Sequence, residues 1–313
     1  MKWWLICMFF DFSDFYGNKD KYFDDNCPKY LLKFVDSEFF DSTLSGYIHV
    51  QSVWSYVAPE DRKALSAAQA DDGEMSIRLS FKDTTGPNEL LFIAPLSDPS
   101  NRHLVIPTID PVTGCYTYNF TMHETYRFPA IQTDLENTLI GSYYGLDAND
   151  VVIQGESISL TDECKSNLFK SQLNTTANGD DRSYVIYDCR LFFNAIIDNI
   201  IDYPDLMSAA GFRLSMGMIS YYDNFDNDRV STYLNKIDEL SQSNDEDKRL
   251  QAMMYLINNK QKKYERQREF RLSIAVDNSD SQLTIKTITS FFSATKVEND
   301  IKESIIYQAS ALV

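Results

Sequence analysis

Several signatures of catalysis are missing from this 313-residue chain. It has three histidines, and His123-Glu124 lacks the second histidine that the H-E-x-x-H helix of a metalloprotease requires. No Walker loop, dinucleotide-binding glycine pattern or nucleophile elbow occurs, so a glycine-rich phosphate cradle is not expected. The glycines are isolated, and we interpret them as turn residues: Gly46, Gly73, Gly86, Gly114, Gly141 and Gly145.

Cysteine forms no metal or disulfide pattern. The five cysteines are widely spaced, odd in number and without a C-x-x-C pair: Cys7, Cys27, Cys115, Cys164 and Cys189. Such spacing fits neither a zinc site nor a disulfide framework. The acidic turn Asp223–Asp228 also lacks the glycine and the terminal glutamate of a calcium loop. We therefore expect no metal, and free thiols in a reducing cytoplasm.

Long apolar runs are absent as well. A membrane span needs about 20 apolar residues, and no stretch approaches that length. The segment Met1–Phe10 is apolar, but Asp11 ends it and no small-residue cleavage site follows, so we predict a buried strand there rather than a signal peptide. With 43% hydrophobic and 24% charged residues, the composition is that of a globular protein. We expect no membrane association and a cytoplasmic location.

Positive charge is scarce, because 29 lysines and arginines face 46 aspartates and glutamates, for a net charge of −17. An acidic surface repels phosphate backbones, so nucleic acid is not expected as a partner except through the basic segment 260–271. A protein with a basic surface is the partner that this charge favours, although charge can also serve solubility alone. Tyrosine and phenylalanine are abundant, at 19 and 20 residues, and tyrosine and tryptophan supply contact area at interfaces.

The hydrophobic patterns predict an α+β fold: mixed, mainly antiparallel sheets with flanking helices, without regular βαβ alternation. We expect one large domain over 1–313, with a subdivision near the polar stretch 174–182 as the alternative. Strands are predicted over 3–10, 29–35, 47–53, 75–81, 90–94, 115–122, 184–189, 212–222, 270–276 and 283–288, the last pairing with its predecessor, and a β-hairpin or paired strands around Gly155 are predicted over 151–160. Helices are predicted over 36–44, 59–70, 191–201, 232–241 and 245–262, and a helix or strand over 296–312.

The most informative segment is 259–276, where a basic stretch leads into an apolar strand. Gln267-Arg268-Glu269 lies at the junction, and strand alternation would place Gln267 and Glu269 on one face. A carboxylate beside a polar partner can bind a ribose hydroxyl or stabilise developing positive charge. The structural alternative is that Glu269 pairs with a nearby lysine or arginine across the sheet.

This triplet resembles the Q/E-x-E turn that precedes a strand in ADP-ribosyltransferase-like folds. In that superfamily the glutamate orients the nicotinamide ribose and supports an oxocarbenium-like transition state. The stretch from Tyr30 to Ile48, which ends in Leu-Ser-Gly-Tyr-Ile, is similar to the first strand, helix and L-x-G-x-I entry of such domains. It also looks like bacterial and phage proteins that end in a Q-x-E-[FY]-R strand.

The resemblance implies Glu269 and Gln267 as catalytic residues, and Lys33 or His49 at an NAD cofactor. The family expects an arginine or histidine on the first strand, where this chain has Lys33, and a lysine lacks the fork-shaped donor. His49 lies on the next predicted strand, and no Ser-Thr-Ser element stands at a matching place. The active site of such a fold would therefore be degenerate.

Two functions follow from these observations. The first is an acidic intracellular interaction protein, encoded by a phage or mobile element, that needs no cofactor and modulates a protein partner in host defence or counter-defence. The alternative is an NAD-dependent, ADP-ribosyltransferase-like enzyme. An enzyme needs Glu269 in a concave cleft, whereas an interaction protein needs an exposed acidic or aromatic patch.

Overall fold

The computed structural model describes part of the chain. The described residues are 27–54, 76–81, 92–93, 103–104, 108–109, 116–121, 136, 138–154, 157–172, 183–200, 202–203, 213–222, 232, 236, 239, 243–275 and 288–309. The predictions for the strand over 3–10, the helix over 59–70, the polar stretch 174–182 and the turn 223–228 lie outside these residues.

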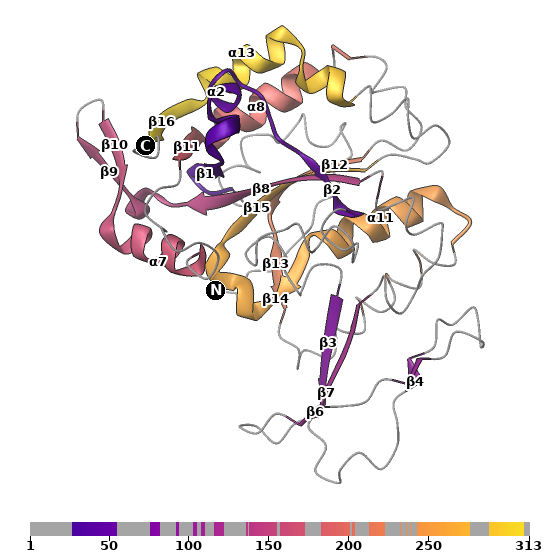
Figure 1. Ribbon diagram of the computed structural model, residues 1–313. Coiled ribbons are helices and arrows are strands. Elements are labelled where there is room, and N and C mark those ends of the chain that lie inside the picture. The colour runs from indigo at the N-terminus through magenta and orange to yellow at the C-terminus, as the bar shows by residue number, and fades with distance from the viewer. Residues whose placement is uncertain are drawn as a thin grey trace.

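A seven-stranded antiparallel sheet forms the centre of the described structure (Figure 1). The strand order is β12-β15-β8-β1-β11-β16, and β2 also pairs with β8. Strands β8 and β1, which precede 174–182, lie between strands that follow it, so this sheet contains strands from both sides of that segment. Its strands are β1 (Tyr30–Val35), β2 (Gln51–Ser52), β8 (Thr138–Leu146), β11 (Ser183–Asp188), β12 (Arg213–Met218), β15 (Glu269–Ala275) and β16 (Ile305–Ala309).

Smaller strand pairs and helices complete the described elements, and together they confirm the α+β, mainly antiparallel prediction. An antiparallel hairpin joins β9 (Val151–Gln154) to β10 (Ser157–Leu160), and a short parallel pair joins β13 (Ser220–Tyr222) to β14 (Asn259–Gln261). A three-stranded antiparallel sheet contains β3 (Ser76–Phe81), β6 (Thr108–Ile109) and β7 (Tyr116–Thr121). A two-stranded antiparallel sheet contains β4 (Phe92–Ile93) and β5 (His103–Leu104). The helical elements are η1 (Ser37–Phe39), α2 (Phe40–Leu44), η3 (Ala148–Asp150), α7 (Asp162–Gln172), α8 (Cys189–Ile200), α11 (Glu246–Ile257), η4 (Lys262–Gln267) and α13 (Thr295–Glu303).

Strand alternation gives the sheet two different faces. The α8 face is the side on which Phe270, Leu272 and Ile274 of β15 share a core with Leu31 of β1 and Tyr143 of β8. Helices α8 and α13 cover this face, and Figure 1 shows them on the opposite side of the sheet from α7 and α11. The buried residues of α8 recur at helical spacing, as the sequence predicts: Phe192, Phe193, Ile196, Ile197 and Ile200.

The α11 face is the other side of the sheet. Tyr30 and Leu32 of β1 pack there in a second core with α7 and the β9–β10 hairpin. Further along, this face carries the alternate residues of β15, which are polar: Glu269, Arg271 and Ser273. These three residues lie where β15 contacts α11. The α11 face therefore buries a charged strip next to its apolar part.

Gly46 ends the α2 turn as the sequence predicts. Its backbone has a φ of +95°, its N–H donates to the Thr43 carbonyl, and the Tyr47 N–H donates to the Ser42 carbonyl. This is the Schellman pattern, which favours glycine at that position. A Cβ at Gly46 would lie 1.9 Å from the carbonyl oxygen of Glu298, so the glycine also permits α13 to approach.

Two predicted turn glycines instead lie inside the long central strand β8, so that interpretation of Gly141 and Gly145 was wrong. The Gly145 N–H donates to the carbonyl of Arg268 at 2.8 Å. A Cβ there would come within 2.8 Å of the Met218 Sδ atom. Gly145 therefore serves a close approach of neighbouring chain segments rather than a turn, whereas a Cβ at Gly141 would make only ordinary contacts, the nearest at 3.4 Å.

Two other predictions need correction. Helix α11 ends at Ile257, not at 262, because the side-chain amides of Asn258 and Asn259 donate to carbonyls of its last turn and the chain continues as β14. The strand over 270–276 cannot pair with 283–288, because β12 and β8 occupy both of its edges. The end of the chain forms both predicted alternatives in succession, α13 and then β16.

Candidate functional site

The Gln267-Arg268-Glu269 triplet spans the junction of η4 and β15. Gln267 is the last residue of the 3-10 turn, and Arg268 adopts a φ of +44° before β15 begins at Glu269. Two ion pairs, to Asp147 and Asp150, hold the Arg268 guanidinium. Gln267 therefore lies outside the strand alternation, and the prediction that it shares a strand face with Glu269 was wrong.

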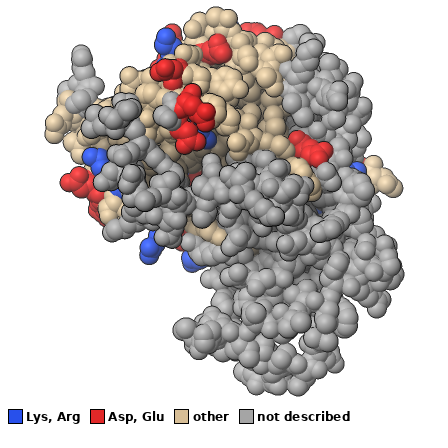
Figure 2. All heavy atoms as spheres, in the orientation of Figure 1, with Lys and Arg blue, Asp and Glu red and all other residues tan. Residues whose placement is uncertain are grey.

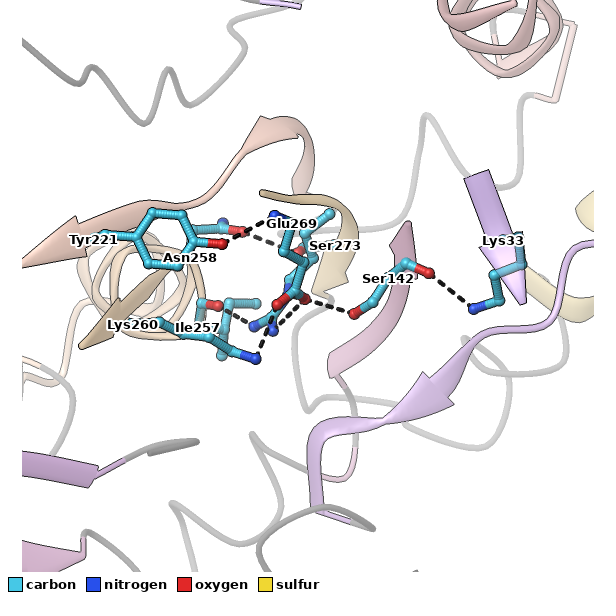
Figure 3. A network of polar contacts seen from close by, with 9 residues as sticks. Lys33, Ser142, Tyr221, Ile257, Asn258, Lys260, Glu269 and Ser273 are labelled. Atoms are coloured by element: carbon cyan, nitrogen blue, oxygen red, sulfur yellow. Dashed lines mark hydrogen bonds and ion pairs between the residues drawn. The ribbon is translucent and has the colours of Figure 1, made fainter. Parts of the chain in front are cut away.

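Glu269 is buried and has cationic partners on both carboxylate oxygens (Figure 3). Its Oε1 accepts from Arg271 Nε at 2.8 Å and Nη2 at 2.6 Å, and from Ser142 Oγ at 2.6 Å. Its Oε2 pairs with Lys260 Nζ at 2.8 Å. The structure thus shows the pairing with an arginine and a lysine that the structural alternative predicts, but not across the sheet: Arg271 belongs to the same strand, and Lys260 belongs to β14 of a separate strand pair.

The electrostatics keep this carboxylate ionised. Burial acts to raise the pKa of Glu269, but the charges of Arg271 and Lys260 outweigh it and hold the pKa well below its usual range. Arg271 also donates to the Ile257 carbonyl at the end of α11. A carboxylate with such partners acts as the centre of a buried ion network, which fixes β14 and α11 to the sheet.

Neutral groups extend this buried strip in both directions along the α11 face. The Glu269 backbone N–H donates to the Tyr221 hydroxyl at 2.9 Å, and burial raises the pKa of that hydroxyl well above its usual value. At the other end, Ser273 Oγ donates to Asn258 Oδ1 at 3.3 Å. Such pairing satisfies buried polar groups that would otherwise be costly.

Lys33 lies on the α8 face of the same sheet. Its neighbours in β1, Leu31 and Val35, belong to the α8-face core, and its Nζ lies 5.1 Å from the centre of the Tyr143 ring. The ammonium donates to the Ser142 carbonyl at 2.9 Å. Burial lowers the pKa of Lys33 to about 8, against the opposing charges of Glu269 and Asp36.

A local opening between strands makes that carbonyl available to Lys33. Strand β1 pairs with β8 only at 144–146, and β2 pairs with β8 only at 139–140. Ser142 lies between these two contacts, so on this edge of β8 its carbonyl has no partner strand and binds the side chain of Lys33 instead. Its carbonyl binds Lys33 and its hydroxyl binds Glu269, as Figure 3 shows.

His49 lies in the chain that leads to β2, close enough to Lys33 for the two charges to interact. Its ring stacks on Phe39 with centroids 5.3 Å apart, and its Nε2 lies 3.3 Å from Gln51 Nε2. Burial first, and the charge of Lys33 second, lower the pKa of His49. The structure therefore places His49 within the electrostatic influence of Lys33, and the sheet separates Lys33 from the carboxylate of Glu269.

An exposed patch that the sequence did not identify lies on the η1–α2 stretch. We define the acidic–aromatic patch as Asp36, Glu38, Phe39, Asp41 and Tyr47, all exposed. Phe39 and Tyr47 are 40% and 37% exposed, which is high for rings of this size. No described basic side chain forms an ion pair with these three carboxylates, and Figure 2 shows acidic side chains gathered on the part of this face where α2 lies in Figure 1.

Comparison with protein-family models, curated proteins and solved structures finds no match. The ADP-ribosyltransferase-like resemblance therefore stays a prediction. Within the described ranges, no three histidine, cysteine, aspartate or glutamate side chains are grouped as a metal site requires. None of the helices in those ranges has the length and apolar character needed to cross a membrane.

Proposed function

We propose that this protein binds a partner protein through its acidic–aromatic patch, which accepts a basic surface of that partner. The observation that carries the proposal is the patch itself: three carboxylates and two exposed rings on one short stretch. The resemblance to phage and bacterial proteins extends this proposal to a role: the protein modulates its partner in host defence or counter-defence inside the cell. No cofactor is needed for it.

The chemistry of the patch suits lysine and arginine side chains. Carboxylates form charge-assisted hydrogen bonds with these cations, and an aromatic face attracts them as well. The net charge of −17 favours fast encounter with a positively charged partner. Charge complementarity thus selects a basic protein surface as the occupant.

The patch is also held in a fixed shape. Phe40 and Leu44 of α2 pack against the α8-face core, and the Gly46 turn lies against α13. A surface that is already ordered loses less conformational entropy when it binds. The state of Glu269 favours this function over the enzymatic alternative, because Arg271, Lys260 and Ser142 already occupy its carboxylate oxygens.

The test is a calorimetric titration with a short arginine-rich peptide, comparing wild type with Asp36→Asn/Glu38→Gln/Asp41→Asn. Each exposed ion pair contributes up to about 1 kcal/mol, so the loss of three should weaken binding by about tenfold or more. Phe39→Ala/Tyr47→Ala should weaken binding at high salt too, because the apolar part of the ring contacts is not screened by salt.

The matched control is Glu163→Gln/Glu265→Gln/Glu303→Gln, which removes the same charge from exposed positions outside the patch. Equal weakening in control and patch variants would show that net charge alone attracts the peptide and would contradict the proposal. Binding of NAD with release of nicotinamide by the wild type would instead favour the enzymatic alternative.

A further inference from the structure

Two cysteines that are far apart in the sequence lie together in the structure. Cys27 precedes β1 and is half-buried, whereas Cys189 is the buried first residue of α8. Cys27 packs against the core cluster that contains Cys189, and its thiol lies close enough to that of Cys189 to raise the pKa of Cys189. The third cysteine in the described part of the chain, Cys164, belongs to the core on the α11 face.

The β1–β11 pairing explains why the two thiols meet. Tyr30 lies opposite Asp188 in the antiparallel register, and the ladder continues one step further where the Cys189 N–H donates to the Lys29 carbonyl at 3.2 Å. The Asp188 carboxylate accepts from the Leu191 N–H and thereby caps α8. The position of Cys189 is therefore fixed beside the chain that leads into β1.

We propose that Cys27 and Cys189 form an oxidisable dithiol, which a peroxide closes to an intramolecular disulfide. Of these two thiols, the partly exposed Cys27 is the one that solvent reaches first, and buried Cys189 is the resolving thiol. This inference is independent of the acidic–aromatic patch and of its partner.

The chemistry balances with hydrogen peroxide as the oxidant. The Cys27 sulfur attacks one peroxide oxygen, so an S–O bond forms, the O–O bond breaks, and the leaving hydroxide takes a proton to become water. The Cys189 sulfur then attacks the Cys27 sulfur, which forms the S–S bond and breaks the S–O bond. The departing hydroxide takes the Cys189 proton and leaves as a second water, so two electrons pass from the dithiol to the peroxide.

The division of roles agrees with the environment of each thiol. The neighbouring Cys27 thiol and then burial raise the pKa of Cys189 well above its usual value, so Cys189 by itself is a poor nucleophile toward solvent oxidants. Oxidation of Cys27 to the sulfenic acid removes that constraint and supplies an electrophilic sulfur next to it. The expected product is thus one specific disulfide rather than stepwise over-oxidation of either residue.

The experiment treats the reduced full-length protein with an equimolar amount of hydrogen peroxide, blocks the remaining thiols with iodoacetamide, and maps disulfides by mass spectrometry after non-reducing digestion. We expect the Cys27–Cys189 peptide as the main product, reversible with dithiothreitol. Five cysteines allow ten pairs, so unselective oxidation would give this pair only about a tenth of the time. The same treatment of urea-unfolded protein should lose the selectivity.

Variants test the assignment further. Cys27→Ser should abolish the disulfide and leave Cys189 reduced, whereas the matched control Cys164→Ser should form it to the same extent as wild type. The oxidised protein should also melt at a higher temperature than the reduced protein, because the link restricts the unfolded chain. A dominant disulfide between Cys27 and another cysteine, or Cys27 that proceeds to sulfinic acid while Cys189 stays reduced, would overturn the proposal.

Discussion

Replacing Glu269 with alanine should destabilise the fold by about 3–5 kcal/mol, the usual cost of removing one member of a buried ion pair. The structure sets this magnitude because the side chains of Arg271 and Lys260 are only 1% and 7% exposed, and the substitution leaves two buried cations without their shared carboxylate. A typical domain has 5–15 kcal/mol of total stability. The predicted loss is therefore a large fraction of the free energy of unfolding of such a domain.

The assay is urea denaturation followed by circular dichroism, with the free energy of unfolding compared at constant slope. The control is Lys260→Met/Glu269→Leu/Arg271→Met, in which apolar side chains replace all three charges. This variant should lose far less stability than Glu269→Ala, because it leaves no buried charge unpaired. The difference between the two separates the electrostatic penalty from packing.

The pH dependence provides an independent check. The pKa of Glu269 is lower in the folded protein than in the unfolded chain, so its contribution is fully present above about pH 4.3 and is lost as the pH falls below that value. As the pH falls below about 4.3, wild type should therefore lose more stability than Glu269→Ala does. If Glu269→Ala unfolds within about 1 kcal/mol of wild type and yet abolishes nicotinamide release from NAD, the structural reasoning is refuted.

Three further predictions concern other parts of the described fold. Gly46→Ala should cost about 2 kcal/mol or more in urea denaturation, because its φ of +95° disfavours other residues and the new Cβ meets the Glu298 carbonyl; a loss under about 0.5 kcal/mol would contradict this. The melting temperature of wild type relative to Lys33→Met should rise as the pH goes from about 8 toward 10, because the folded-state pKa of Lys33 is lowered and its unfolded-state side chain binds more protons in that range; the raised pKa values of Cys164 and Cys189 act in the opposite direction in both proteins, so a difference that stays constant over this range would contradict the reasoning. Phe193→Ala, at a fully buried position in α8, should cost about 3–5 kcal/mol by calorimetry, and an unchanged melting temperature would show that α8 is not part of the core.

Local sequence patterns predicted much of the secondary structure. The apolar spacing in 191–201 predicts α8, the 151–160 stretch predicts the β9–β10 hairpin, and Gly46 predicts the end of α2. Each depends on interactions within a few residues, such as helical periodicity or a left-handed glycine. The overall acidity, and with it the expectation of a basic partner, is likewise a property of composition.

The tertiary structure decided what depends on residues distant in the chain. Strand β8 was not predicted because Gly141 and Gly145 resemble turn residues in the sequence, and only the tertiary structure shows Met218 and the Arg268 carbonyl packed against Gly145. The sequence predicted that Glu269 either binds a ligand or pairs with a cation, and only packing against β14 placed Lys260 on its second oxygen.

The candidate site shows the same division. Sequence reasoning selected Lys33, His49, Gln267 and Glu269, but only strand order and alternation show that Lys33 and Glu269 lie on opposite faces with Ser142 between them. The meeting of Cys27 with Cys189 depends equally on the β1–β11 register. Composition and short-range pattern thus determined the fold class, several elements and the charge of this protein, whereas the pairing of distant strands decided which side chains meet, because no local interaction specifies contacts between residues so far apart in the chain.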